Sequence, residues 1–153
     1  MSKSSQASAG ARTRARELMV QALYQKQIAG HTTAELVAQF REDTAYARVD
    51  QAFFDELFPA ISNGQEHIEK KIDSLIDRPL AQLDPIELSI LLIGVHELET
   101  RIDIPYKVVI NEGVNLAKRF GSTDGHKYIN ACLDAAAQSL REVEVQAKAK
   151  AGG

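Results

Sequence analysis

The sequence predicts an all-α protein, a single compact domain of about seven helices, and three observations support this. Apolar residues recur at helical spacing along most of the chain, whereas the strict alternation of a half-buried strand is absent. Pro and Gly residues separate these segments at places where helices begin and end. A length of 153 residues and a hydrophobic content of 44% suffice for one core.

The apolar spacing gives the positions of the expected helices. They lie near residues 12–29, 33–42, 49–58, 60–77, 85–100, 105–120 and 125–145. Residues 1–11 and 146–153 are small, polar and aperiodic, so we expect flexible tails on either side of a helical domain at 12–145. Pro59 either separates the third and fourth helices or kinks one longer helix, because proline removes a backbone donor.

Capping signals support the starts of the last three helices. In the segment LDPIEL, Asp84 is placed to cap a helix and Pro85 suits its first position. Glu87 stands where a capping box has its reciprocal acceptor. Pro105 marks the start of the next helix and Gly121 its end, and one of the three following residues is expected to cap the last helix.

The charges of the chain are unevenly distributed. The net charge is -3, yet residues 1–30 contain five basic side chains and one acidic, and residues 105–128 contain four basic and two acidic. An acidic body with two basic segments indicates a localised site for a polyanion, because proteins that coat nucleic acid nonspecifically are usually basic throughout. The alternative is that both segments are solvated helix faces.

The first expected helix carries three arginines at its start. With about 100° between successive residues, Arg12 and Arg16 lie at one edge of the apolar stripe and Arg14 at the other. They can therefore converge only at the end of the helix. There they add charge to a helix N-terminus that is already partly positive, which favours phosphate binding.

The same helix has a second apolar row, formed by Val20, Tyr24 and Ile28. Either the domain encloses this row or a partner protein binds it. Tyr24 is the main candidate for partner contact, because an aromatic ring with a polar tip suits an interface.

In the helix expected at 105–120, the side chains of Lys107, Asn111 and Lys118 lie opposite the apolar face, where two lysines and an amide can follow a phosphate backbone. Lys127 and Tyr128 follow on the next helix. Tyr128 lies at the edge of the core stripe, where its ring either stacks on an unpaired base or packs as an ordinary edge residue.

No catalytic or cofactor motif is evident in the sequence. The segment HELET lacks the second histidine of the zinc-protease motif, because Thr100 stands in its place, and no glycine-rich phosphate loop occurs. Cys132 is the single cysteine and falls on an apolar stripe. No apolar run approaches the roughly 20 residues of a membrane span. We therefore expect a cytoplasmic protein that is not an enzyme and uses no metal or cofactor.

Three segments together resemble the NusB family of bacterial transcription antitermination factors. They are RTRARELMVQALYQ, GVHEL and IPYKVVINEGVNLAKRFGSTDGHKYINACLD, and the resemblance covers about residues 12–141. It implies an all-helical protein that binds boxA-type single-stranded RNA together with the ribosomal protein NusE. This binding takes place within the RNA polymerase antitermination complex of ribosomal RNA operons. The alternative is a helical protein–protein adaptor with weak, nonspecific RNA affinity. Some relatives dimerise, so a homodimer is a further alternative.

The resemblance and the charge pattern together nominate site residues. Those expected to bind RNA are Arg12, Arg14, Arg16, Lys107, Lys118, Asp124, Lys127 and Tyr128. Those expected to bind NusE are Val20, Tyr24 and Glu87. Glu87 has a competing role as a capping acceptor.

Overall fold

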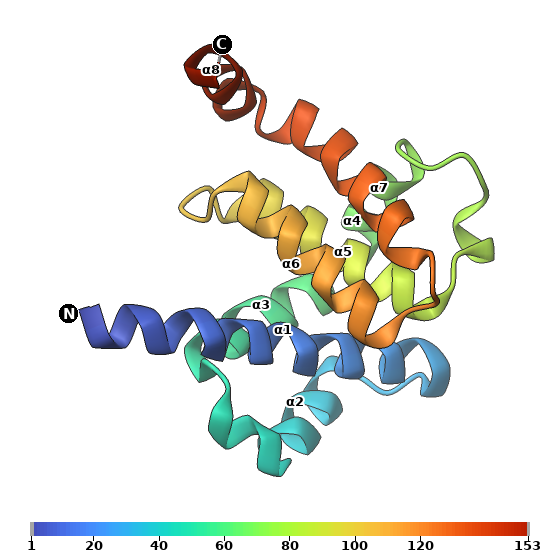
Figure 1. Cartoon of the computed structure of the whole chain (residues 1–153). Coiled ribbons are helices and arrows are strands. Elements are labelled where there is room, and N and C mark those ends of the chain that lie inside the picture. Colours follow the sequence, from blue (N-terminus) through green and yellow to red (C-terminus); the bar gives the residue numbers. More distant parts are fainter. Residues whose placement is uncertain (1, 153) are drawn as a thin grey trace. The chain divides into compact units, whose positions relative to one another are not determined.

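The computed structural model describes residues 2–152, and it describes side chains from residue 9 to residue 151 (Figure 1). Within these residues all regular secondary structure is helical, with eight α-helices and two short 3₁₀ helices. The predicted all-α fold is confirmed, with one more α-helix than the seven expected. The chain contacts divide after Gln65 into two compact units.

The first unit is built around α1 (Ser2–Ala29). This helix packs against α2 (Thr33–Arg41), the 3₁₀ helix η1 (Thr44–Arg48) and α3 (Gln51–Asn63). The α1 stripe predicted from helical spacing is buried, namely Ala15, Leu18, Met19, Ala22 and Leu23. Burial of this stripe, rather than helix propensity alone, stabilises α1 in the folded chain.

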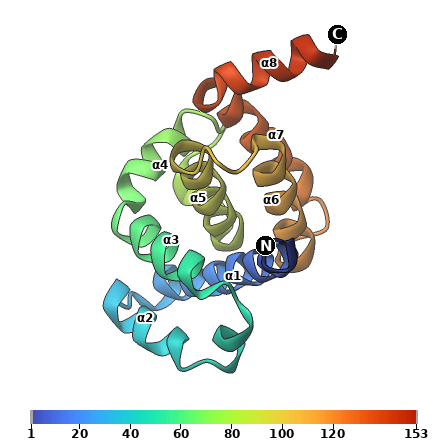
Figure 2. The same cartoon turned by 90° about the vertical axis from the view of Figure 1, so that its left-hand side faces the viewer.

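The second unit begins at the second residue of α4 (Gln65–Asp73). It also contains the 3₁₀ helix η2 (Leu80–Gln82), α5 (Pro85–Thr100), α6 (Tyr106–Phe120), α7 (Gly125–Leu140) and α8 (Glu142–Gly152). Helices α5, α6 and α7 pack against one another, and α8 contacts α7. Figure 2 shows α5 in the middle of this unit. Its run from Leu88 to Val95 is buried without interruption, which explains the longest apolar stretch in the sequence.

Two glycines allow the three central helices to approach closely around one leucine. A Cβ atom on Gly94 would lie 2.6 Å from Leu133 Cδ2, and one on Gly113 would lie 2.5 Å from Leu133 Cδ1. Leu133 itself is fully buried. The space that each glycine leaves is therefore filled by the α7 leucine, as expected of a close-packed interior.

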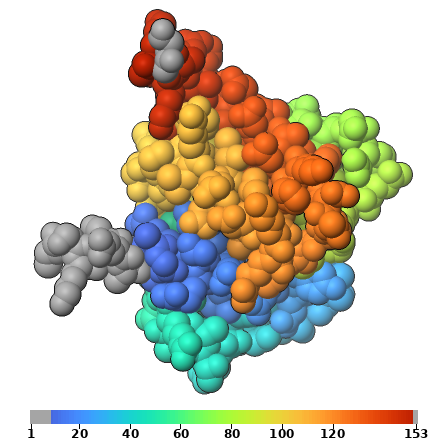
Figure 3. All heavy atoms as spheres, in the orientation of Figure 1, coloured from blue at the N-terminus to red at the C-terminus, as the bar shows by residue number. Residues whose placement is uncertain are grey.

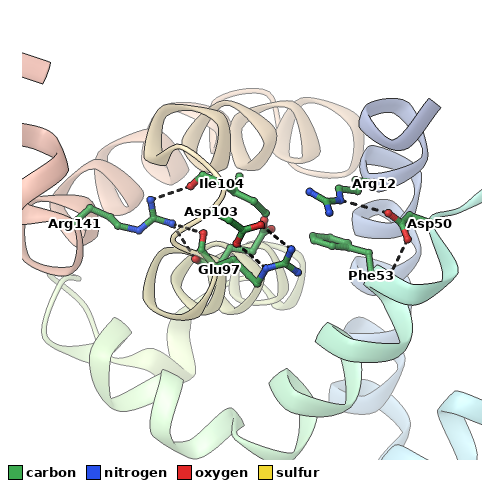
Figure 4. Close-up of polar contacts among 8 residues, drawn as sticks. Arg12, Asp50, Phe53, Glu97, Asp103, Ile104 and Arg141 are labelled. Carbon is green, nitrogen blue, oxygen red and sulfur yellow. Dashed lines mark hydrogen bonds and ion pairs between the residues drawn. The ribbon is translucent and has the colours of Figure 1, made fainter. Parts of the chain in front are cut away.

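Arg141 holds together the end of this unit where α5 stops and α8 starts (Figure 4). Its guanidinium donates hydrogen bonds of 2.6–3.2 Å to the backbone carbonyls of Glu97, Leu98, Arg101 and Ile104. Glu144 accepts from Arg141 at 2.7 Å and from the Tyr106 backbone N–H at 2.9 Å. One buried cation thus ties together backbone carbonyls at the end of α5 and in the loop that follows it; those of Glu97 and Arg101 also accept backbone N–H groups.

Pro59 lies inside α3, which continues to Asn63. Of the two alternatives that the sequence left open at this proline, the structure therefore shows a continuous helix rather than a break. The helix ends instead at Gly64, whose N–H donates to the Ala60 carbonyl at 2.9 Å. Ile61 and Ser62 are buried after the proline, and this packing outweighs the one backbone hydrogen bond that proline removes.

Other helix boundaries also differ from the predictions. The α4 helix stops at Asp73, four residues before the expected end at 77. At the chain ends, α1 begins at Ser2 rather than near 12, and α8 covers most of segment 146–153. The two end segments contain several alanines, which favour a helix, but they lack the apolar period by which helices were predicted. Residues 1 and 153 lie outside the described chain, and the predicted flexibility of the tails stays untested.

Candidate nucleic-acid interface

The basic segment 105–128 folds into α6, a short turn and the start of α7. In the turn, the Gly121 N–H donates to the Ala117 carbonyl at 2.8 Å and the Gly125 N–H to the Ser122 carbonyl at 3.1 Å. Helices α6 and α7 lie side by side in the space-filling view (Figure 3). A groove of about 420 Å³ is lined by Lys107, Ile110, Asn111, Val114, His126, Lys127 and Asn130 of these helices.

Two of the predicted RNA-binding lysines line this groove. Lys107 comes from the first turn of α6 and Lys127 from the first turn of α7, and both are exposed. Lys127 Nζ lies 3.7 Å from Asp124 Oδ1, and both side chains of this pair are more than 70% exposed, at 74% and 81%. Such a pair contributes little to stability, so the lysine charge is available to an anion. Lys118 is exposed in the last turn of α6.

Tyr128, the predicted stacking residue, is half-buried, and Arg78 lies over its ring. The guanidinium carbon is 4.5 Å from the ring centroid. The Tyr128 hydroxyl is buried and has no hydrogen-bond partner among the described residues. Burial, followed by the neighbouring Cys132, raises the pKa of Tyr128 to about 12. A stacked base must therefore use the other ring face or displace Arg78.

Tyr128 and the groove lie on different sides of α7. Residues two positions apart in a helix point about 200° away from each other. His126 and Asn130, which line the groove, are each two positions from Tyr128. The structure therefore brings Lys107 and Lys127 together, but it separates the Tyr128 ring from the groove.

The three arginines of α1 occupy different environments in the first unit. Arg12 is 34% exposed, and its Nε lies 3.4 Å from Asp50 Oδ2 (Figure 4). Arg14 is exposed and donates to a backbone carbonyl of η1 at 3.0 Å. Arg16 is only 2% exposed, with its guanidinium 5.0 Å from the Phe53 ring centroid. Arg14 is thus the most accessible of the three.

The predicted convergence of these arginines at a helix N-terminus is wrong. Because α1 begins at Ser2, the arginines lie in the body of the helix, where the partial positive charge of the terminal amides is absent. At that place they point in different directions, and Arg16 packs as a buried cation. An anion on this face would contact Arg14 and the exposed part of Arg12.

The predicted partner residues of α1 also differ in exposure. Tyr24 is 39% exposed and Ile28 is 60% exposed, whereas Val20 is fully buried. The row is therefore enclosed at Val20 and open at Tyr24 and Ile28. Only its open end is accessible from the surface.

Glu87 lies near the start of α7 in the second unit. Its Oε1 would be 3.1 Å from a Cβ atom on Gly125, so the glycine makes room for the carboxylate. Asp84 caps α5 as predicted, accepting from the Ile86 and Glu87 N–H groups at 2.7 and 3.3 Å. No reciprocal capping bond to Glu87 occurs among the described residues. Burial and then Asp84 raise the pKa of Glu87, against the opposing effect of Arg78.

Comparison with known proteins adds the family. Residues 13–138 match the model of the NusB family. The chain belongs to the NusB family. It is 49% identical over 136 residues to the transcription antitermination protein NusB of Pseudomonas syringae pv. tomato, covering 89% of this chain and 82% of that protein. Identity to the Marinobacter nauticus protein of the same name is 42% over 144 residues, covering 94% and 91%.

The NusB fold is also found in the solved structure of T. maritima NusB. The TM-score is 0.74 at 23% identity, and the match covers 84% of this chain and 91% of that chain. The predicted family and fold class are therefore confirmed. As a NusB-family member the chain is a transcription antitermination protein and not an enzyme.

Two further findings concern the part of the chain that the structure describes. It contains no helix with the length and apolar character of a membrane span. It also contains no cluster of His, Cys, Asp or Glu side chains suited to hold a metal ion.

Arg78 is a candidate NusB site residue that sequence reasoning missed. It lies in the segment between α4 and η2, where the chain has no periodic pattern. Its side chain pairs with Asp77 at 3.3 Å and reaches Tyr128. Contact between residues so far apart in sequence arises from the fold, and no local signal in the sequence indicates it.

Proposed function

We propose that the protein binds boxA-type single-stranded RNA jointly with NusE, within the RNA polymerase antitermination complex of ribosomal RNA operons. Family membership supports this proposal, because the relatives are transcription antitermination proteins. A factor that acts on nascent bacterial RNA works in the cytoplasm. The proposal needs an RNA surface and a separate protein surface.

The observation that carries the RNA proposal is the set of exposed lysines on α6 and α7. Lys107, Lys118 and Lys127 are exposed in a chain whose net charge is -3. Exposed cations concentrated on two adjacent helices attract an anionic backbone without making the whole protein basic. Tyr128 adds an aromatic ring on which a base can stack.

The α1 arginines are proposed as a second phosphate contact. Arg14 and the exposed part of Arg12 carry this role, and Asp124 and Arg16 are kept as less direct members of the RNA site. Arg16 packs against Phe53, so it acts by supporting the helix surface on which its neighbours lie. Combined Arg14→Ala and Lys118→Ala changes test whether both segments act on one RNA strand.

The proposed NusE contacts are Tyr24 in the first unit and, separately, Glu87 in the second. Tyr24 and the neighbouring Ile28 form an exposed apolar pair on α1. Aromatic side chains with a polar tip are frequent at the energetic centres of interfaces. Val20 lies one helical turn before Tyr24 and is buried. Its proposed part in binding is therefore to support the surface that Tyr24 and Ile28 form.

Titration of a fluorescein-labelled boxA-type RNA, with and without NusE, tests the RNA proposal. We expect NusE to tighten binding, and the logarithm of the affinity to fall with that of the salt concentration by roughly 0.7 per phosphate contacted. The Tyr128→Ala variant should lose roughly 1–3 kcal/mol of binding free energy. Weak binding that NusE leaves unchanged would support the adaptor alternative.

A matched pair of α1 variants tests the partner surface. Tyr24→Asp and Gln21→Asp each place a carboxylate on an exposed position of α1. We expect Tyr24→Asp to abolish the gain that NusE confers while intrinsic RNA affinity is unchanged, and Gln21→Asp to retain the gain. Equal NusE binding by both variants removes Tyr24 from the interface. Sedimentation of the protein alone checks the homodimer alternative.

A further inference from the structure

The groove between α6 and α7 has the properties of a binding site that the stacking role of Tyr128 does not use. It is about 420 Å³ in volume and lies on the side of α7 away from the tyrosine ring. Its lining combines three kinds of side chain: two cations, two amides with one imidazole, and two aliphatic groups. Pockets that bind small organic groups combine an apolar surface with a few polar atoms in this way.

The charged side chains of the groove come from both helices. Lys107 lies on α6 and Lys127 on α7, and both are exposed. No ion pair of Lys107 occurs among the described residues, and Lys127 has only the exposed contact with Asp124. The groove therefore presents two cations with little internal neutralisation, which suits the phosphates on either side of one nucleotide.

The uncharged side chains suit the nucleobase itself. Ile110 and Val114 provide aliphatic surface for the face of a planar ring, and Asn111 and Asn130 are exposed amides from opposite helices. An asparagine amide both donates and accepts hydrogen bonds, as the edges of unpaired bases do. An acidic peptide would use the lysines but would leave these amides without a specific role.

We propose that the α6–α7 groove binds one unpaired RNA nucleotide, with the base against Ile110 and Val114, its edge at Asn111 and Asn130, and its phosphates at Lys107 and Lys127. This inference rests on the proposed RNA-binding function. It gives Asn111 and Asn130 a base-reading role, and it makes the groove a second base site on the side of α7 opposite Tyr128. The strand then crosses α7 between the two sites.

The test uses the full chain, the fluorescein-labelled boxA-type RNA and three variants. Asn111→Ala and Asn130→Ala change groove amides, while Asn115→Ala changes an exposed amide of α6 that does not line the groove. We expect each groove variant to weaken RNA binding several-fold, and the double variant to weaken it about tenfold, because an amide that reads a base edge discriminates by about this factor. The salt dependence should not change, since no charge is removed.

The control variant and a cross-linking measurement separate this site from the rest of the surface. Asn115→Ala should bind RNA as tightly as the unchanged protein. RNA carrying 4-thiouridine at successive positions should cross-link to the tryptic peptide VVINEGVNLAK, residues 108–118 of α6. The nucleotide that cross-links to this peptide should differ from the nucleotide that stacks on Tyr128, which is the one whose contribution to RNA affinity disappears in Tyr128→Ala.

The outcomes distinguish the groove from the function on which it rests. If the unchanged protein binds RNA and Tyr128→Ala weakens that binding, but the double groove variant binds normally, the groove inference is overturned and the proposed function stands. A loss shared equally by Asn115→Ala also overturns the groove. If the unchanged protein binds no RNA with or without NusE, both proposals fall.

Discussion

The two ends of α7 both carry basic side chains, and the structure gives these charges opposite uses. At the C-terminal end, Arg141 is 4% exposed and donates to four backbone carbonyls and to Glu144. At the N-terminal end, the Lys127 side chain is 74% exposed and meets only Asp124 at 3.7 Å. The Arg141 cation is therefore fully engaged in contacts within the protein, whereas the Lys127 cation is available to a ligand.

The arginines of α1 show the same contrast within a single turn of helix. Arg16 is buried against Phe53, whereas Arg14 is exposed. Counting basic residues in a segment therefore overestimates the charge that a polyanion meets. Exposure and existing partners decide which cations attract phosphate, because a buried guanidinium with its N–H groups satisfied has no donor to offer.

The largest effect is expected from Arg141→Ala. The change removes the guanidinium hydrogen bonds to four backbone carbonyls and to the Glu144 carboxylate, which should lower the free energy of unfolding by about 3–5 kcal/mol. Urea denaturation followed by circular dichroism measures this value. Arg141→Lys should recover only part of it, since an ammonium has three donors and no planar fork. Wild-type stability in Arg141→Ala would contradict a structural role.

A smaller loss of stability is expected from Gly113→Ala. The added Cβ would lie 2.5 Å from Leu133 Cδ1 in a fully buried place, and overpacking of this kind costs about 1–3 kcal/mol. Urea denaturation measures the loss. Asn115→Ala on the exposed side of the same helix is the control, and its stability should change by less than about 0.5 kcal/mol. Similar values for both variants would show that α6 moves away from α7 easily.

The pairing of Glu144 with Arg141 should make the stability of the fold sensitive to acid. Burial alone raises the pKa of Glu144, but the Tyr106 N–H and Arg141 outweigh it and lower this pKa below its ordinary value. A lowered pKa stabilises the fold above the unfolded pKa of about 4.3, and this contribution is lost as the pH falls through the folded pKa. Urea midpoints measured from pH 7 to about pH 3 should therefore fall less steeply in Glu144→Gln than in the unchanged protein. Parallel curves would count against the pairing.

The smallest effect on stability is expected from Lys107→Ala and Lys127→Ala. Both side chains are exposed, so the free energy of unfolding should stay within about 0.5 kcal/mol of the original value. Each change should nevertheless reduce the salt slope of RNA binding by about 0.7, because one phosphate contact is lost. Fluorescence anisotropy at several salt concentrations measures this slope. An unchanged slope in both variants would mean that neither lysine contacts phosphate.

Most of the helices could be predicted from local pattern, because burial of one face imposes a period of 3.6 residues on the sequence. The stripe of α1 and the Asp84 cap of α5 follow this rule. The sequence did not decide whether the helix breaks at Pro59, because proline disfavours a continuous helix locally whereas tertiary packing of the residues after it maintains one. The start of α1 and most of α8 have no apolar stripe in their sequence, so periodicity could not indicate these helical segments.

The candidate site was predictable only in part. Sequence reasoning found Lys107, Lys118 and Lys127, which are exposed. It named Tyr24 as the main candidate for partner contact, and that side chain is 39% exposed. It missed Arg78, because contact with Tyr128 depends on the path of a loop without periodic pattern. It also treated Val20 as available to a partner, although that side chain is buried.

The amino-acid sequence alone determined the all-helical class, the family resemblance and the two basic segments, because helix period, capping residues and charge are local properties of the chain. Only the tertiary structure decided which cations are exposed, which side of α7 each candidate faces, and that a groove lies between α6 and α7. The exposure of a side chain and the presence of a groove depend on how segments distant in sequence pack together, and the sequence of one segment does not show which segment will cover it.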